Sequence, residues 1–382
     1  MHKLELYIRF ISPLFSSNDG NNFKLTPQTL RGILRFWFRA VVPRVLNIDR
    51  FNDENKDLIG LKKAEEYIFG STKMRSSFDI VVEEIDIKRG YLSEKEKRYQ
   101  LYGLNNGLNK REYAIENSKV KVVIYLKKKD KDIGELIKYL FVLVSIVGGI
   151  GSKSRKGYGS FEILNQKKYT LEEILNILDD INRRIFSRIK GFDIQPTAFN
   201  GTVTEFPTLL EGYYDFFIYD RGFSNLEQVF KFLYENSRVD KKGIYLKVKE
   251  KLRKFNRHDS FREAFILINS RDKKIKNKKD KHKKIVFYQS IMGLPINYYV
   301  KSLKKPIKLI PTKGTGERKA SPLFISIHEN EKNKYRLHFL VMRSKLTDNG
   351  RPLLNFGEIT VLGNQDYKQF LNILKEELYS QG

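Results

Sequence analysis

Three arginines spaced four residues apart are the clearest sign of chemistry in this chain. The segment Thr26 to Ala40, TPQTLRGILRFWFRA, contains Arg31, Arg35 and Arg39 and no acidic residue. On an α-helix this spacing aligns the three side chains in one row, where neighbouring like charges repel by roughly 0.2–0.5 kcal/mol per pair. Arginine binds phosphate oxygens through a bidentate fork. The row therefore predicts contact with a polyanion such as RNA, unless carboxylates from elsewhere in the fold pair with it.

A second basic cluster lies in a glycine-rich segment, GGIGSKSRKGYGSFEI, from residue 148 to residue 163. Its five glycines surround Lys153, Arg155 and Lys156. Glycine lets backbone amides approach phosphate closely, and the basic side chains neutralise it. Tyr158 has a ring that is suited to stacking on a base. We expect an RNA-binding loop that lines one groove together with the arginine row, and a flexible hairpin is the alternative.

Other chemistries fit the sequence less well. A P-loop would need glycine where Ile146 stands, and a dinucleotide-binding fingerprint would need glycine where Ser154 stands. The chain has no cysteine, so thiolate metal sites and cysteine nucleophiles are excluded. No cluster of histidine and carboxylate residues has the spacing of metal ligands, so we predict neither metal nor cofactor. The histidines lie outside both basic motifs; they are His2, His258, His282, His328 and His338.

A weaker signal occurs in the second half of the chain. Arg318 and Lys319 precede the segment KASPLFISI, which runs from Lys319 to Ile327. Two nearby glycines suggest a loop that leads into a strand. We take Arg318 and Lys319 as further candidate RNA contacts, with an ordinary surface loop as the alternative.

Composition supports a polyanionic partner. The 382 residues carry a net charge of +27, with 72 Lys and Arg against 45 Asp and Glu. Such a charge repels itself unless a polyanion neutralises it. AT-rich codon usage is the alternative source of the lysines. The N-terminus lacks the apolar block of a signal peptide, and the most apolar window, Leu136 to Val147, is too short to span a bilayer. We therefore expect a cytoplasmic protein.

The first half of the chain has an alternating pattern of strands and helices. Thr26 and Pro27 predict the start of a helix, which ends near Val42 with Trp37 on its apolar face. The remaining predicted elements are strands Leu4–Phe10, Phe78–Ile87, Lys119–Lys127 and Phe161–Leu164 and a buried helix, Glu135–Val147. This β-α-β-β-α-β order is the ferredoxin-like arrangement, with residues 90–117 as an insertion.

The second half gives a weaker pattern. It contains predicted strands Tyr213–Tyr219, Phe324–His328, Leu337–Arg343 and Glu358–Leu362, and helices Leu171–Ile189, Leu226–Tyr234 and Tyr367–Leu378. We predict an α+β fold of tandem ferredoxin-like domains, with an N-terminal domain at 1–168, a linker helix at 169–192 and a C-terminal domain at 193–382. The lysine-rich stretch Arg271 to Lys284 predicts a mobile loop.

These motifs resemble those of the Cmr1-like family of RAMP proteins. The helix motif matches Leu30 to Ala40, the glycine loop matches Gly148 to Ser160, and KASPL matches Lys319 to Leu323. The resemblance implies tandem ferredoxin-like domains in a subunit of the type III-B CRISPR effector complex. It implies binding to guide RNA near its 3′ end, capture of target RNA, contact with other RAMP subunits and a role in antiviral defence.

The resemblance carries RNA binding to the two basic motifs but carries no catalysis, because neither motif contains the loop aspartate of the target-cutting subunits. We therefore expect a protein that is not an enzyme. Two alternatives remain: a RAMP endoribonuclease that processes guide-RNA precursors, and a structural cap that binds mainly neighbouring subunits. Incubating the protein with repeat RNA distinguishes all three.

Overall fold

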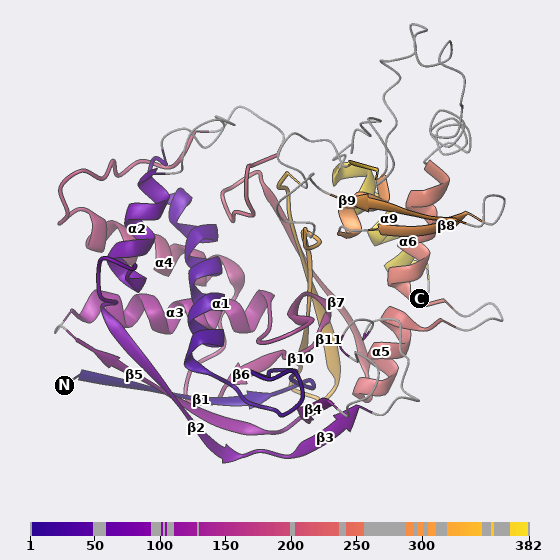
Figure 1. Ribbon diagram of the computed structural model, residues 1–382, viewed down its shortest axis with the longest axis horizontal. Coiled ribbons are helices and arrows are strands. Elements are labelled where there is room, and N and C mark those ends of the chain that lie inside the picture. The colour runs from indigo at the N-terminus through magenta and orange to yellow at the C-terminus, as the bar shows by residue number, and fades with distance from the viewer. Residues whose placement is uncertain are drawn as a thin grey trace, which may run out of the picture. The chain divides into compact units, whose positions relative to one another are not determined.

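The computed structural model describes most of the chain (Figure 1), namely residues 2–48, 59–92, 101, 104, 111–127, 130–198, 203–236, 242–255, 288–293, 296–300, 305–310, 319–345, 353–354 and 367–380. The chain forms two compact units. The first contains residues 1–201, 207–229 and 323–342, and the second contains residues 202–206, 230–322 and 343–382.

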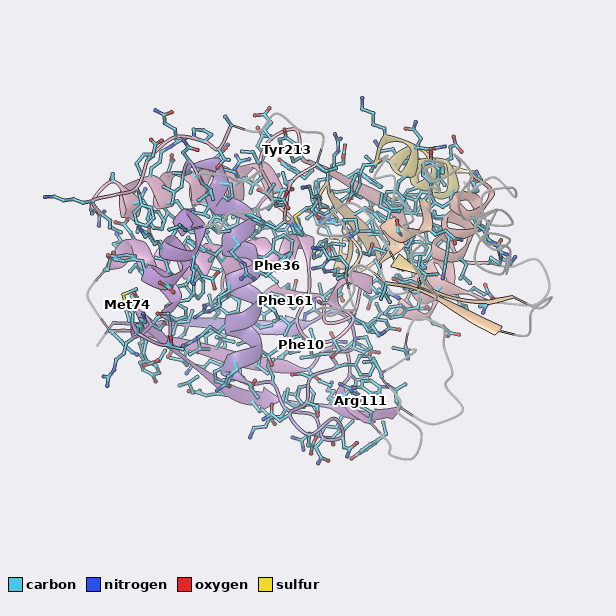
Figure 2. All side chains as sticks on the ribbon, turned by 45° about the horizontal axis from the view of Figure 1, so that its top comes forward. Phe10, Phe36, Met74, Arg111, Phe161 and Tyr213 are labelled. Atoms are coloured by element: carbon cyan, nitrogen blue, oxygen red, sulfur yellow. The ribbon has the colours of Figure 1, made fainter. Side chains whose placement is uncertain are left out.

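A four-stranded antiparallel sheet forms the base of the first unit. Its order is β2-β5-β1-β6, with strands β1 (His2–Phe10), β2 (Phe78–Asp86), β5 (Lys119–Leu126) and β6 (Phe161–Ile163). Alternate residues of β1 are buried, beginning with Leu6 and ending with Phe10. Phe10 pairs with Phe161 across β1 and β6, and both rings are buried (Figure 2). The alternation in the sequence thus reflects one face turned to the core.

Helices cover that face of the sheet (Figure 1). They are α1 (Pro27–Val41), α2 (Ile59–Phe69), α3 (Lys131–Val147) and α4 (Leu171–Phe186). The Thr26 hydroxyl caps α1 by accepting from the Thr29 amide at 3.2 Å, as predicted. α3 begins before the predicted Glu135 because the Asp130 side chain caps it. The order is the predicted β-α-β-β-α-β with α2, which we did not predict, added after α1.

Strands from the second half complete the first unit. They are β7 (Tyr214–Phe223), β10 (Leu323–Glu329) and β11 (Tyr335–Met342), which form an antiparallel sheet of order β10-β11-β7. Ser326 on β10 donates to the Ile146 carbonyl at 3.0 Å, and the Ile327 amide donates to the Ser160 hydroxyl at 3.0 Å. Because these contacts join β10 to α3 and the glycine loop, the first unit includes strands from the range 193–382, which we predicted as a separate domain.

The insertion predicted at residues 90–117 contributes an antiparallel pair, β3 (Arg89–Leu92) and β4 (Arg111–Ala114). The second unit has a three-stranded sheet of order β12-β9-β8. Its strands are β8 (Ile296–Val300), β9 (Lys305–Ile310) and β12 (Leu353–Leu354), and its helices include α6 (Ile244–Phe255) and α9 (Tyr367–Tyr379), with α5 (Leu226–Tyr234) leading into it. The lysine-rich stretch 271–284 and the strand predicted at 358–362 lie outside the described residues. Among the described helices, none is long and apolar enough to cross a membrane.

Candidate nucleic-acid site

The arginine row faces carboxylate and carbonyl groups of its own chain. Arg35 Nη1 donates to Glu65 Oε1 at 2.7 Å, and Arg39 Nη1 donates to the other oxygen of that carboxylate at 3.2 Å. Glu65 lies on α2, the helix that the sequence pattern did not lead us to predict. Helix α1 has no carboxylate next to the row, and α2 therefore supplies one through Glu65.

Backbone carbonyls accept further hydrogen bonds from the guanidinium groups of this row. Arg35 Nη2 donates to the carbonyls of Phe69 and Gly70, at 3.0 and 2.7 Å, where α2 ends. Arg31 Nη2 donates to the Phe78 carbonyl at 3.2 Å, at the start of β2. The row thus fastens α2 and β2 to α1. The side chains of Arg31, Arg35 and Arg39 remain 30, 30 and 42% exposed, and their contact with RNA stays a prediction.

The glycines of the loop permit close packing against the protein's own backbone. Gly151 and Gly159 have φ angles of +80° and +65°. A Cβ added to Gly151 would lie 2.4 Å from the Phe15 carbonyl oxygen, and one added to Gly159 would lie 1.9 Å from the Ile150 carbonyl oxygen. The Ser152 amide donates to that Phe15 carbonyl at 2.8 Å. The glycines therefore satisfy an internal steric need, whichever ligand the loop binds.

The basic side chains of the loop are half-buried around a short 3₁₀ turn, Ser154–Lys156. The guanidinium carbon of Arg155 lies 4.3 Å from the Phe324 ring centre and 5.2 Å from that of Phe36. Burial lowers the pKa of Arg155 to about 10, so the group still carries its charge at neutral pH. The loop thus holds one cation against two aromatic rings.

Other predicted contacts are placed differently. Tyr158 is only 2% exposed, and its ring centre lies 5.5 Å from that of Phe15. We correct its predicted stacking on a base, because the ring packs inside the protein. Lys319 is half-buried in the second unit, and Arg318 lies outside the described residues. Trp37 is 2% exposed, as predicted for a core residue.

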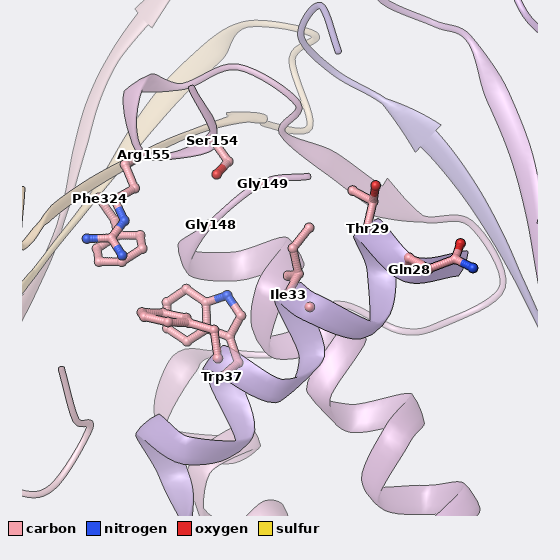
Figure 3. A pocket seen from close by; sticks show the side chains of 11 residues that line it. Gln28, Thr29, Ile33, Trp37, Gly148, Gly149, Ser154, Arg155 and Phe324 are labelled. Atoms are coloured by element: carbon pink, nitrogen blue, oxygen red, sulfur yellow. The ribbon is translucent and has the colours of Figure 1, made fainter. Parts of the chain in front are cut away.

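A pocket of about 260 Å³ lies between α1, the glycine loop and β10 (Figure 3). Helix α1 contributes Gln28, Thr29, Gly32, Ile33, Phe36 and Trp37 to its lining. The loop contributes Gly148, Gly149, Ser154 and Arg155, and β10 contributes Phe324. All three segments singled out in the sequence therefore meet here. The expected groove shared by both basic clusters was wrong in this respect: Arg155 lines the pocket, whereas the arginine row faces α2 and β2.

Gly32 is the residue in this lining that packing does not explain. It lies inside α1, where glycine costs about 1 kcal/mol relative to alanine. It is exposed, and a Cβ built on it would meet nothing within 4 Å. A larger side chain would therefore meet no clash at this edge of the lining. Sequence reasoning missed Gly32, Phe36 and Phe324 as site residues, although each stands in or directly after a motif.

Two histidines of β10 and β11 lie together beside α3. The ring centres of His328 and His338 are 3.6 Å apart and nearly parallel, at 18°. His338 Nδ1 lies 3.0 Å from the Ile146 carbonyl oxygen. Burial lowers the pKa of His338 to about 4 and that of His328 well below its ordinary value. His338 is 6% exposed, which leaves little access for a substrate. Within the described ranges, no three histidine, aspartate or glutamate side chains gather as metal ligands would.

The sequence comparisons agree with one another, because both find RAMP proteins. Residues 7–162 match the RAMP superfamily. Over 154 residues the chain is 32% identical to the CRISPR system Cmr subunit Cmr1-1 of Pyrococcus furiosus, a match that covers 38% of this chain and 42% of that protein. Over 189 residues it is 24% identical to Cmr1-2 of the same organism, covering 43% of this chain and 96% of that one. The matched segment thus spans less than half of the first relative's length.

A solved structure supports the same fold. The crystal structure of Cmr1 from Pyrococcus furiosus in its apo form aligns with a TM-score of 0.55 at 18% identity, and the alignment covers 99% of this chain and 98% of that one.

Proposed function

We propose that this chain is a Cmr1-like protein of the RAMP superfamily and that it serves as a non-catalytic RNA-binding subunit of a type III-B CRISPR complex that targets RNA. The observation that carries the proposal is the meeting of three motif segments, from α1, the glycine loop and the start of β10, around one pocket that contains Arg155. The net charge of +27 favours a partner with many negative charges, because such a partner neutralises it.

Within that complex the chain would contact guide RNA near its 3′ end, help to capture target RNA and dock against other RAMP subunits in the cytoplasm, in antiviral defence. The Cmr names of the relatives support this placement. Two ferredoxin-like domains in tandem are part of the same proposal.

The basic residues of the glycine loop are the leading candidates for phosphate contacts. Lys153 and Lys156 flank Arg155 at the turn, and all three are half-buried. The arginine row is a weaker candidate, because Glu65 already balances part of the charge of Arg35 and Arg39. Of the three, Arg39 has the most exposed side chain, at 42%.

The burial of His338 and the low pKa of both paired histidines argue against the alternative of an endoribonuclease. General acid–base catalysis needs a group within hydrogen-bonding reach of the RNA and a pKa near the working pH. His338 lies inside the first unit with a pKa of about 4, and the burial of His328 holds its pKa low as well. The pair is therefore a better candidate for a packing role than for cleavage of RNA.

Binding to repeat-derived single-stranded RNA without added metal tests the proposal. We expect the full chain to retain RNA and to leave it intact. Replacing Lys153 and Lys156 by Ala should weaken binding several-fold and make the slope of log K against log salt shallower by about 0.7 for each phosphate that the variant no longer neutralises.

Replacement of Lys62 and Lys63, two exposed lysines on α2, is the matched control for the change in net charge. It should have the smaller effect. Cleaved RNA would favour the nuclease, and absence of any binding would favour the structural cap.

A further inference from the structure

The pocket beside Arg155 has properties that phosphate contact alone does not require. A phosphate site is a cluster of donors at the surface, whereas this site is a cavity of about 260 Å³ with aromatic walls. Trp37 and Phe324 are buried in its wall, and Phe36 is half-buried. Its lining has one cationic side chain and, among the described residues, no carboxylate.

Arg155 presents a flat surface that is already held in place. Its guanidinium lies over the Phe324 ring (Figure 3), and the guanidinium carbon is 4.3 Å from the ring centre. The ring restricts the plane of the guanidinium, so less conformational freedom is lost when a second flat group stacks on it. Unpaired bases of RNA stack in this way on aromatic rings and on arginine planes.

The polar groups around the cavity are few and differ in kind. Ser154 contributes a hydroxyl group from the glycine loop, and Thr29 lies in the α1 wall with its hydroxyl 3.0 Å from that of Thr26 (Figure 3). Hydroxyl groups both donate and accept hydrogen bonds, which suits the edge of a base. Apolar walls with a few placed polar groups are typical of sites for a small organic group.

From these features, and resting on the proposed function, we infer that the pocket receives one unpaired nucleotide of the bound RNA, with its base stacked on Arg155. Gly32 belongs to the lining, so we expect a bulky side chain at this position to compete with the nucleotide for space. The binding of RNA would then depend on a base at one position and not on phosphates alone.

Trp37 makes the inference testable, because it is the only tryptophan of the chain and lines the pocket. The full chain is titrated with a single-stranded RNA oligomer, with the same length of abasic ribose-phosphate strand, and with the four nucleoside monophosphates. Tryptophan fluorescence and a filter-binding assay are followed in parallel. We expect base-containing RNA to change the Trp37 emission saturably and the abasic strand to bind at least about tenfold more weakly.

Gly32→Ala and Gly32→Leu are the test variants, and Gly60→Ala on α2 is the control. A Cβ at Gly60 meets only Ile48, at an ordinary 3.9 Å, and Gly60 is not part of the lining. We expect Gly32→Ala to raise the melting temperature, as helix propensity requires. Gly32→Leu should abolish the fluorescence change and bring RNA affinity down to that of the abasic strand, while Gly60→Ala binds as the unaltered chain does.

Each other outcome overturns the inference. If Gly32→Leu binds RNA as tightly as the unaltered chain, RNA binds elsewhere and only the proposed function survives. If no RNA binds to the unaltered chain, the proposed function fails and the inference fails with it. If monophosphates change the Trp37 emission while oligomers do not, the pocket is a site for a free nucleotide.

Discussion

Replacing Arg35 by alanine should destabilise the first unit, although its position in a basic row suggests a purely functional role. Arg35 donates to Glu65, Phe69 and Gly70, at 2.7, 3.0 and 2.7 Å. Hydrogen bonds that involve a charged group contribute about 1.5–3 kcal/mol each when buried. Because the Arg35 side chain is 30% exposed, we discount this sum and expect a loss of about 2–4 kcal/mol.

Arg39→Ala provides the internal comparison. Arg39 has a single contact with Glu65, at 3.2 Å, and its side chain is 42% exposed. A pair of this kind contributes about 0–1 kcal/mol. The two arginines therefore have the same charge and spacing but are expected to differ clearly in their effect on stability.

Urea denaturation followed by Trp37 fluorescence is the appropriate assay, because the only tryptophan lies on α1 and reports on the first unit alone. A double-mutant cycle with Glu65→Gln should give a coupling of about 1 kcal/mol between Arg35 and Glu65. A change below about 0.5 kcal/mol for Arg35→Ala, together with a loss of RNA affinity, would refute the structural role and restore the interpretation of the row as an RNA contact.

Three further outcomes are expected. Because folded His338 has a pKa of about 4 against an ordinary 6.5, the unfolded chain binds more protons between these values. Acidification through this range should therefore lower the free energy of unfolding, with His338 alone contributing up to about 1.4 kcal/mol per pH unit, and urea melts of His338→Phe should show a flatter profile. Trp37→Ala should cost about 3–5 kcal/mol by leaving a cavity, measured by circular dichroism because the fluorophore is removed. RNA affinity should fall steeply with salt, by a slope of about −0.7 per phosphate contact, and a flat response in the same filter-binding assay would exclude the glycine loop as a phosphate site.

Much of the secondary structure could be predicted because local patterns determine it. The cap formed by Thr26 and Pro27, the alternation in β1 and the apolar sequence of α3 each locate an element within a few residues. In the second half, the predicted helix Leu226–Tyr234 coincides with α5. Helix α2 was missed even though its buried residues Leu61, Ala64 and Ile68 have helical spacing, so the signal was present in the sequence.

The candidate site was harder to predict because it depends on contacts between distant segments. Nothing near Arg35 in the sequence indicates Glu65, thirty residues away, and nothing near Arg155 indicates Phe324. The unit boundaries have the same cause, because β10 and β11 are joined to the first unit by contacts such as that between Ser326 and Ile146. Sequence periodicity shows which face of an element is apolar but does not show which partner covers it.

The motifs contain residues that the packing of the protein itself requires and one residue, Gly32, that it does not require. The positive φ angles and close contacts of Gly151 and Gly159 are required by the backbone of the loop itself. Arg35 is required by the end of α2, and both requirements hold with or without RNA. Gly32 has no such requirement, and it lowers helix propensity without relieving any clash. Packing therefore does not account for glycine at position 32, and the effect of Gly32→Leu on RNA affinity decides whether the inferred nucleotide requires it.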